Sequence, residues 1–206
     1  DICGHHLSYQ INAAGKHQAI NSLGVLAAVH AIGASLELAA ASLRDFKAMK
    51  GRGERRKIIG KDGTFEIIDE SYNSSPASMI AAIKVLASAR PLRRGKRVAV
   101  IGDMLELGSR SKDLHASLAE PILSSGIDLV FTAGTQAVAL WDRLPSTVRG
   151  GHAFNASELK HLVLEAIGDG DIALVKGSQG SRMTEIVNAL DALDGVIDDP
   201  SFGKGA

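Results

Sequence analysis

Two short, uninterrupted apolar runs constrain the fold of this chain more than any other feature. They span Val98–Ile101 and Ile172–Val175 and contain only Val, Ile, Leu and Ala. Such a run, with no polar alternation, is typical of a parallel strand buried on both faces. Helix-periodic segments of about ten to fifteen residues separate these runs from other predicted strands. The pattern therefore predicts βαβ units and an α/β fold with a mostly parallel sheet.

The remaining elements fit this scheme. Predicted strands are Lys57–Gly60, Thr64–Asp69, Arg97–Ile101, Asp128–Thr132, Gly151–Phe154 and Asp171–Val175. Predicted helices between and after them are Ala77–Ala89, Ser111–Ser124, Gln136–Asp142, Ala156–Ala166 and Arg182–Leu193. The first two strands form a hairpin through Lys61-Asp62-Gly63, because Asp-Gly favours a tight turn.

The first fifty residues are patterned differently. Helices are predicted at Gln18–Ile32, ended by Gly33, and at Ser35–Lys47, and the alternating stretch Leu7–Ile11 favours a strand. The segment Lys50–Arg56 is rich in glycine and charge and has no apolar period, so it marks a domain boundary. Two helices cannot bury their apolar faces alone, and the chain begins at Asp1 without a methionine. We therefore expect it to be part of a longer protein.

Composition excludes several classes of function. The 206 residues are long enough to bury a substantial core, and a formal net charge of zero argues against nucleic acid or a membrane surface as partner. Cys3 is the single cysteine, which indicates a reducing compartment such as the cytoplasm. The Ala/Leu-rich segment 21–41 contains His30 and Glu37, so it predicts soluble helices and no membrane span.

Polar loops follow four of the predicted strands. The first is Asp69–Pro76, in which Ser75 and Pro76 are suited to cap and begin a helix. The others are Gly102–Gly108, Ala133-Gly134-Thr135 and Lys176–Arg182. In an open α/β sheet, ligands bind beyond the carboxyl ends of the strands. Glycine and serine loops that enter helices suit anions. The sequence therefore predicts an anion-binding rim, although each loop alone also reads as a simple turn.

Other catalytic patterns are absent or weak. The sequence contains no G-x-x-x-x-G-K-[ST], no G-x-S-x-G and no G-x-G-x-x-G after a strand. The adjacent histidines His5-His6 do not form a metal cluster, and His115 is expected at the surface or in packing, not as a base. Asp103 and Glu106 are equally compatible with helix capping and with chemistry. Arg52, between two glycines, is suited to reach a phosphate.

Five strings occur in a fixed order along the chain. They are Gly15–Asn21, Gly51-Arg52, Ile68–Met79, Gly102–Gly108 and Lys176-Gly177-Ser178. Together they resemble the Mur ligases of bacterial cell-wall synthesis, over nearly the whole chain. Within that family, the chain resembles the ligase that adds D-alanyl-D-alanine to UDP-N-acetylmuramoyl-tripeptide. Two strings carry this closer resemblance, Asp-x-x-Tyr-Asn-x-x-Pro-x-Ser-Met and Gly-Asp-Met-x-Glu-Leu-Gly.

The resemblance implies a domain plan. Family members have a UDP-sugar domain, a central ATPase domain with a P-loop, and a C-terminal Rossmann-like domain. Residues 1–50 would be the end of the central domain, 51–195 the C-terminal domain, and 196–206 a flexible tail. The P-loop and the Mg²⁺ ligands would lie outside this chain, so no metal site is expected here and the piece alone is expected to be inactive. The intact enzyme would use ATP and Mg²⁺, pass through an acyl phosphate and act as a cytoplasmic monomer.

The resemblance also implies site residues. For the nucleotide, His17 and Asn21 would lie near the adenine, Arg52 near the phosphates and Asp69 on the ribose hydroxyls, with Tyr72-Asn73 shaping the pocket. These are charge-assisted contacts of the kind that phosphoryl transfer uses.

The acceptor side would be formed by Lys176 and Ser178, with Lys176 and Arg52 as the catalytic residues. The sequence departs from the family at Gln18, at Ser74-Ser75 and at Gln179, where arginine is common. Arg182 is the predicted substitute for that arginine.

Two alternatives remain from the sequence. One is another ATP-dependent amide ligase of the same superfamily, such as a folylpolyglutamate synthase, against which the Tyr-Asn-x-x-Pro string argues. The other is a non-catalytic nucleotide- or peptide-binding module, against which the unpartnered helices before residue 50 argue.

Overall fold

A computed structural model describes residues 4–12, 15–46 and 48–195 of the chain. It divides into two compact units, Asp1–Met49 and Lys50–Ala206. Among the described residues, no helix is both long and apolar enough to cross a membrane.

The first unit is a pair of helices, α1 (Lys16–Ala31) and α2 (Leu36–Ser42), the second continued by a 3₁₀ turn at Leu43–Asp45. Gly33 ends α1 with a φ of +72°, as its position predicts. A small core joins the helices and consists of Leu26, Leu36, Ala40 and Leu43.

The predicted strand at Leu7–Ile11 is wrong, because these residues are irregular. Their alternation serves packing instead: Leu7 and Tyr9 lie against the helix pair, and the Tyr9 hydroxyl is 2.8 Å from Ser22 Oγ.

The second unit is built on one six-stranded sheet. Its strands are β1 (Glu54–Gly60), β2 (Gly63–Glu70), β3 (Arg97–Gly102), β4 (Leu129–Ala133), β5 (Arg149–Ala153) and β6 (Ile172–Lys176). They lie in the order β1-β2-β6-β3-β4-β5. Strands β1 and β2 form the predicted antiparallel hairpin, and every other pairing is parallel. The predicted α/β class with a mostly parallel sheet is confirmed.

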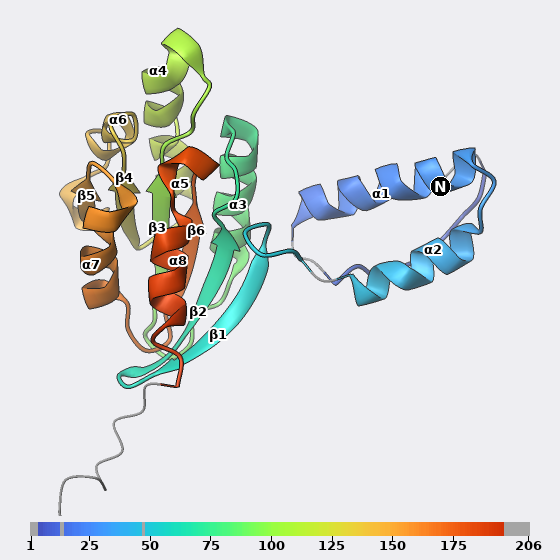
Figure 1. Ribbon diagram of the computed structural model, residues 1–206, viewed down its shortest axis with the longest axis horizontal. Coiled ribbons are helices and arrows are strands. Elements are labelled where there is room, and N and C mark those ends of the chain that lie inside the picture. The colour runs from blue at the N-terminus through green and yellow to red at the C-terminus, as the bar shows by residue number, and fades with distance from the viewer. Residues whose placement is uncertain (1–3, 13–14, 47, 196–206) are drawn as a thin grey trace, which may run out of the picture. The chain divides into compact units, whose positions relative to one another are not determined.

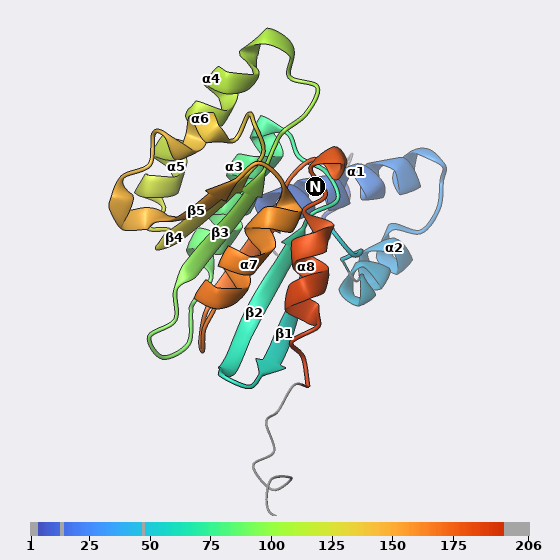
Figure 2. The ribbon, with the colours of Figure 1, turned by 60° about the vertical axis from the view of Figure 1, so that its left-hand side comes forward.

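Helices cover both faces of this sheet (Figures 1 and 2). They are α3 (Pro76–Ser88), α4 (Ser111–Ala116), α5 (Ala119–Ser124), α6 (Val138–Trp141), α7 (Ala156–Ala166) and α8 (Thr184–Asp191). Alternate residues of each strand enter opposite cores. Ile68 and Ala99 pack with α3, α5 and α6, whereas Ile67, Val98 and Val100 pack with α7 and α8. Each inner strand is thus buried on both faces, as the apolar runs predict.

Two helix predictions need correction. The single helix expected at Ser111–Ser124 is two helices, α4 and α5. Pro121 has no N–H to continue the first, but it fits the first turn of the second. The helix expected from Arg182 begins at Thr184, because Arg182 is left-handed (φ 56°) after a 3₁₀ turn. The predicted tail, residues 196–206, lies outside the described residues.

Replacing Ser75 by alanine is expected to lower the free energy of unfolding by about 1 kcal/mol. Ser75 caps α3 in a capping box: its Oγ accepts from Ser78 N at 3.3 Å, and Ser78 Oγ accepts from Ser75 N at 2.9 Å. Urea unfolding measures the change. Ser88→Ala, at the exposed other end of the same helix, is the control and is expected to change stability by less than about 0.5 kcal/mol.

Candidate functional site

The carboxyl ends of the parallel strands meet at one edge of the sheet. In the strand register Glu70 lies beside Lys176, Lys176 beside Ile101, and Gly102 beside Ala133. The four loops singled out in the sequence therefore leave the sheet from this same edge, the rim.

Lys176 ends β6 and is only 1% exposed. Its Nζ donates a hydrogen bond to the Asn73 carbonyl oxygen at 2.8 Å and lies 3.5 Å from Glu70 Oε2. Burial lowers the pKa of Lys176; the Glu70 carboxylate opposes the shift, and the positive charge of Arg52 adds to it. Glu70 is a site residue that sequence reasoning missed. Its place at the end of β2, next to Asp69, was the available signal.

Asp69 is fully buried, and its oxygens are already used within the chain. Oδ1 accepts from Ser71 N at 3.1 Å and from Ser71 Oγ at 2.7 Å, and Oδ2 accepts from Gly51 N at 3.1 Å. The carboxylate therefore holds two loops in place. In this arrangement Asp69 presents no surface to a ligand. Its predicted contact with a ribose stays a prediction.

Arg52 is exposed and stacks on Tyr72, with its guanidinium carbon 4.2 Å from the ring centroid. Gly51 makes this possible: its φ is +76°, and a Cβ there would lie 2.9 Å from Tyr72 Cβ. The Gly51 carbonyl also accepts from Tyr72 N at 3.1 Å. The structure thus brings Arg52, Tyr72, Asn73 and Lys176 into one neighbourhood.

Ser178 is buried and ties three loops of the rim together. Its Oγ accepts from Leu105 N at 2.9 Å and donates to the Ser74 carbonyl at 3.4 Å, while its N–H donates to the Asp103 carbonyl at 2.9 Å. Its hydroxyl is therefore engaged in holding the loops that flank the rim.

Asp103 caps the turn after β4. Of the two roles that the sequence allows, capping and chemistry, the structure shows capping. Oδ1 accepts from Ala137 N at 2.7 Å and from Gln136 N at 3.1 Å. A Cβ on Gly134 would lie 2.2 Å from Asp103 Cγ, so only glycine fits there.

His115 is not at the surface but fully buried. Its Nε2 accepts from Met104 N at 2.9 Å, so Nδ1 carries the hydrogen and donates to the Ser111 carbonyl at 2.7 Å. The neutral imidazole therefore holds the Gly102–Gly108 loop. No pattern in the sequence links His115 to Met104.

A cavity of about 450 Å³ opens beyond the ends of β3 and β4. Its lining includes Asp103, Leu105, Gly134, Phe154, Arg182 and Glu185. Arg182 Nη2 lies 2.6 Å from Glu185 Oε1. The cavity thus combines an apolar wall with an ion pair, which suits a ligand bearing both charged and methyl groups.

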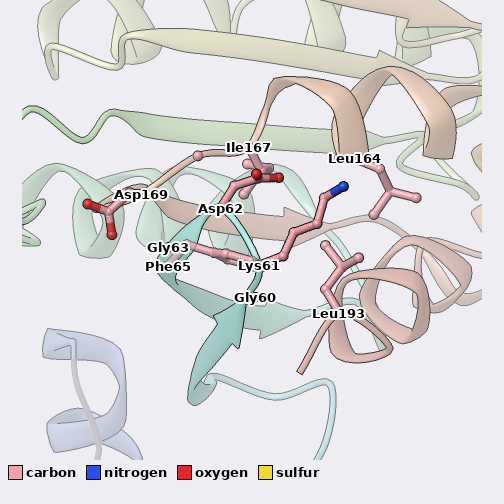
Figure 3. Close-up of a pocket in the computed structure, with 10 residues that line it drawn as sticks. Gly60, Lys61, Asp62, Gly63, Phe65, Leu164, Ile167, Asp169 and Leu193 are labelled. Carbon is pink, nitrogen blue, oxygen red and sulfur yellow. The ribbon is translucent and has the colours of Figure 1, made fainter. Parts of the chain in front are cut away.

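A second cavity, of about 400 Å³, lies at the opposite end of the sheet, beside the β1–β2 turn (Figure 3). Phe65, Leu164, Ile167 and Leu193 line it, and Lys61 extends along it toward Leu164. It shares no residue with the rim.

Two predicted nucleotide residues belong to the first unit. His17 and Asn21 both lie on α1; Asn21 is exposed, and the side chain of His17 is outside the described part of the chain. Their roles stay predictions. In the part of the chain that the structure describes, no group of three or more His, Cys, Asp or Glu side chains is placed to hold a metal ion.

Comparison with known proteins identifies the family to which this α/β domain belongs. A family profile described as "Mur ligase, glutamate ligase domain" matches residues 51–179, which is more than half of the chain, and the chain belongs to the Mur ligase family. The resemblance predicted from the sequence is confirmed.

Two curated relatives that the chain matches are both named UDP-N-acetylmuramoyl-tripeptide--D-alanyl-D-alanine ligase. That of Escherichia coli (strain K12) is 35% identical over 182 residues, which cover 85% of this chain and 37% of the relative. That of Rickettsia prowazekii is 32% identical over 192 residues, or 89% of this chain and 41% of the relative. The chain thus spans about two fifths of the length of these relatives.

Solved structures agree on the fold. A crystal structure of MurF from Acinetobacter baumannii has a TM-score of 0.73 at 27% identity and covers 89% of this chain and 40% of its own. MurF ligase from Thermotoga maritima, solved in complex with ADP, has a TM-score of 0.72 at 23% identity, covering 87% and 39%.

Proposed function

We propose that this chain supplies the C-terminal, substrate-facing part of an ATP-dependent ligase that joins D-alanyl-D-alanine to UDP-N-acetylmuramoyl-tripeptide in peptidoglycan synthesis. The carrying observation is the rim, where Arg52 and the buried Lys176 place two positive charges beside Tyr72 and Asn73. The names of the similar relatives supply the substrate.

In the proposed reaction, a carboxylate oxygen of the tripeptide attacks the γ-phosphorus of ATP, and ADP leaves. The dipeptide amine then attacks the carbonyl carbon of the acyl phosphate; phosphate leaves and the amine loses a proton. Arg52 would offset the negative charge that develops on the phosphoryl group, and Lys176 would do so once its Nζ turns from the Asn73 carbonyl and Glu70 toward the ligand. Both are cations, so they fit phosphate oxygens. Mg²⁺, when bound, would add the same kind of charge stabilisation.

The two units would belong to different domains of the ligase. We propose that residues 1–50 end the central ATPase domain and that 51–195 form the C-terminal domain. His17 and Asn21 would face the adenine, and Asp69 would hold the turn that carries Arg52 toward the nucleotide. With no P-loop pattern in its sequence, this chain would not turn over alone. The complete ligase would be cytoplasmic and monomeric.

The cavity beyond β3 and β4 is our proposed site for the dipeptide. A dipeptide of alanine has one carboxylate, one amine and two methyl groups. Arg182 would bind the carboxylate on release from Glu185, and Leu105 and Phe154 would contact the methyl groups. Ser178 would fix the loop that carries Leu105.

Replacing Arg52 by alanine in the complete ligase is expected to raise the KM for ATP about tenfold, because a charge-assisted phosphate contact is lost. Steady-state kinetics with ATP varied measures this. Arg94→Ala, an exposed arginine before β3 at the opposite end of the sheet, is the control and is expected to leave KM unchanged. An equal KM in the two variants would remove Arg52 from the nucleotide site.

An amine screen tests the substrate assignment. The complete ligase is incubated with ATP, Mg²⁺, UDP-N-acetylmuramoyl-tripeptide and one amine at a time. The products are identified by their mass in mass spectrometry. We expect an adduct with D-alanyl-D-alanine and none with L-glutamate. The same screen with a folate in place of the tripeptide tests the alternative ligase. An adduct of L-glutamate with the folate, and none in the first screen, would point to a folylpolyglutamate-type ligase, and the absence of any adduct from folded protein in both screens would favour a binding module.

A further inference from the structure

One arginine joins the last helix to the interior of the site. Arg56 on β1 donates from Nε to Asp191 Oδ1 at 3.1 Å and from Nη2 to Asp191 Oδ2 at 2.9 Å, a two-point contact with α8. Its Nη1 pairs with Glu54. Its Nη2 also lies 3.7 Å from Oδ2 of the fully buried Asp69. Among the described residues, Arg56 is the one cation paired with that carboxylate.

The Asp69 carboxylate links Arg56 to the Gly51-Arg52 turn. Asp69 Oδ2, the oxygen nearest Arg56, is the one that accepts from Gly51 N. On the backbone, Gly53 N donates to the Asp69 carbonyl at 2.8 Å. Two hydrogen bonds therefore fix the turn to Asp69, and the turn places the Arg52 guanidinium over the ring of Tyr72.

Charge explains why Arg56 matters at this position. A buried carboxylate needs both hydrogen-bond donors and a compensating cation. Burial disfavours the charged guanidinium, but Asp191, Glu54 and Asp69 together outweigh it, so the pKa of Arg56 is raised and it stays cationic. The two-point contact with Asp191 fixes the plane of the guanidinium and so keeps Nη2 at 3.7 Å from Asp69 Oδ2.

We propose that Arg56 is a positioning residue: clamped by Asp191, it holds Asp69, and through Asp69 the Gly51-Arg52 turn, so that Arg52 faces the nucleotide. This rests on the proposed function only for the ligand of Arg52. The clamp itself is a property of the described chain. The neighbouring pair Arg55–Glu66 on the outer edge is the matched comparison, because it joins β1 to β2 without touching Asp69.

Amide hydrogen exchange in the 206-residue chain tests the clamp without reference to function. Arg56→Met is expected to speed exchange of the Gly51 amide at least tenfold while core amides of β3 and β6 stay protected. Arg56→Lys keeps a charge but loses the two-point contact, and is expected to be intermediate. Arg55→Met is the control and is expected to leave Gly51 unchanged. Unaltered Gly51 exchange in Arg56→Met, or equal acceleration in Arg55→Met, would overturn the proposal.

A double-mutant cycle in the complete ligase tests the link to Arg52. Arg56→Met alone is expected to raise the KM for ATP three- to tenfold with kcat per folded enzyme within twofold. In the Arg52→Ala background, Arg56→Met is expected to have no further effect on KM. Additive effects would contradict positioning through Arg52. If Arg52→Ala itself leaves KM unchanged, the nucleotide assignment fails, while the exchange experiment still decides the clamp.

Discussion

Replacing Lys176 by methionine in the complete ligase is expected to lower kcat for dipeptide ligation about a hundredfold, the usual effect of losing one donor to developing negative charge. Methionine has a similar length, so the cavity left in the sheet edge is small. The lost group is the ammonium that now donates to the Asn73 carbonyl and pairs with Glu70. Steady-state kinetics measures kcat, and single-turnover ligation by quenched flow then shows whether the chemical step is slowed, because it separates that step from product release.

Two comparisons make the result for Lys176 specific. Lys84→Met, on the exposed side of α3, is expected to leave kcat unchanged. Thermal unfolding of both variants shows whether the protein stays folded. A folded Lys176→Met variant with a kcat within threefold of the parent would contradict a catalytic role and leave Lys176 as a structural link between β6 and the Asn73 loop.

Replacing Asp69 by alanine is expected to lower the free energy of unfolding of this chain by about 3 kcal/mol. The substitution leaves three donors without their buried acceptor, namely Gly51 N–H, Ser71 N–H and the Ser71 hydroxyl. It also removes one anion from Arg56. Urea unfolding followed by circular dichroism measures this change.

The control for Asp69→Ala is Asp62→Ala, in the exposed β1–β2 turn, with an expected change below about 0.5 kcal/mol. A similar small change for Asp69→Ala would mean that the carboxylate does not hold the two loops. In the complete ligase the same variant is expected to raise the KM for ATP, because the Arg52 turn loses its anchor.

The framework of the second unit is predictable from the sequence because its determinants are local. Val98–Ile101 and Ile172–Val175 are apolar on both faces, and both become inner strands. Ser75 and Pro76 begin α3 as predicted, since capping depends on neighbours within one turn. Strand β1 begins three residues before its predicted start, because charged residues on an edge strand hide its alternation.

The candidate site is less predictable because its contacts are not local. Asp69 reads in the sequence as a ligand carboxylate, yet it bonds to Gly51, 18 residues away, and faces Arg56. His115 reads as a packing residue, but its bond to Met104 gives it a definite task. Such roles follow from which loops meet above the sheet, and no spacing in the chain encodes that.

The most direct test of the central claim is phosphate release by the complete ligase, with ATP, Mg²⁺ and UDP-N-acetylmuramoyl-tripeptide present and D-alanyl-D-alanine added or withheld. We expect steady release only when the dipeptide is present, because its amine discharges the acyl phosphate. Release that is the same with and without the dipeptide, from protein shown to be folded, would contradict the assignment of this chain to a D-alanyl-D-alanine-adding ligase.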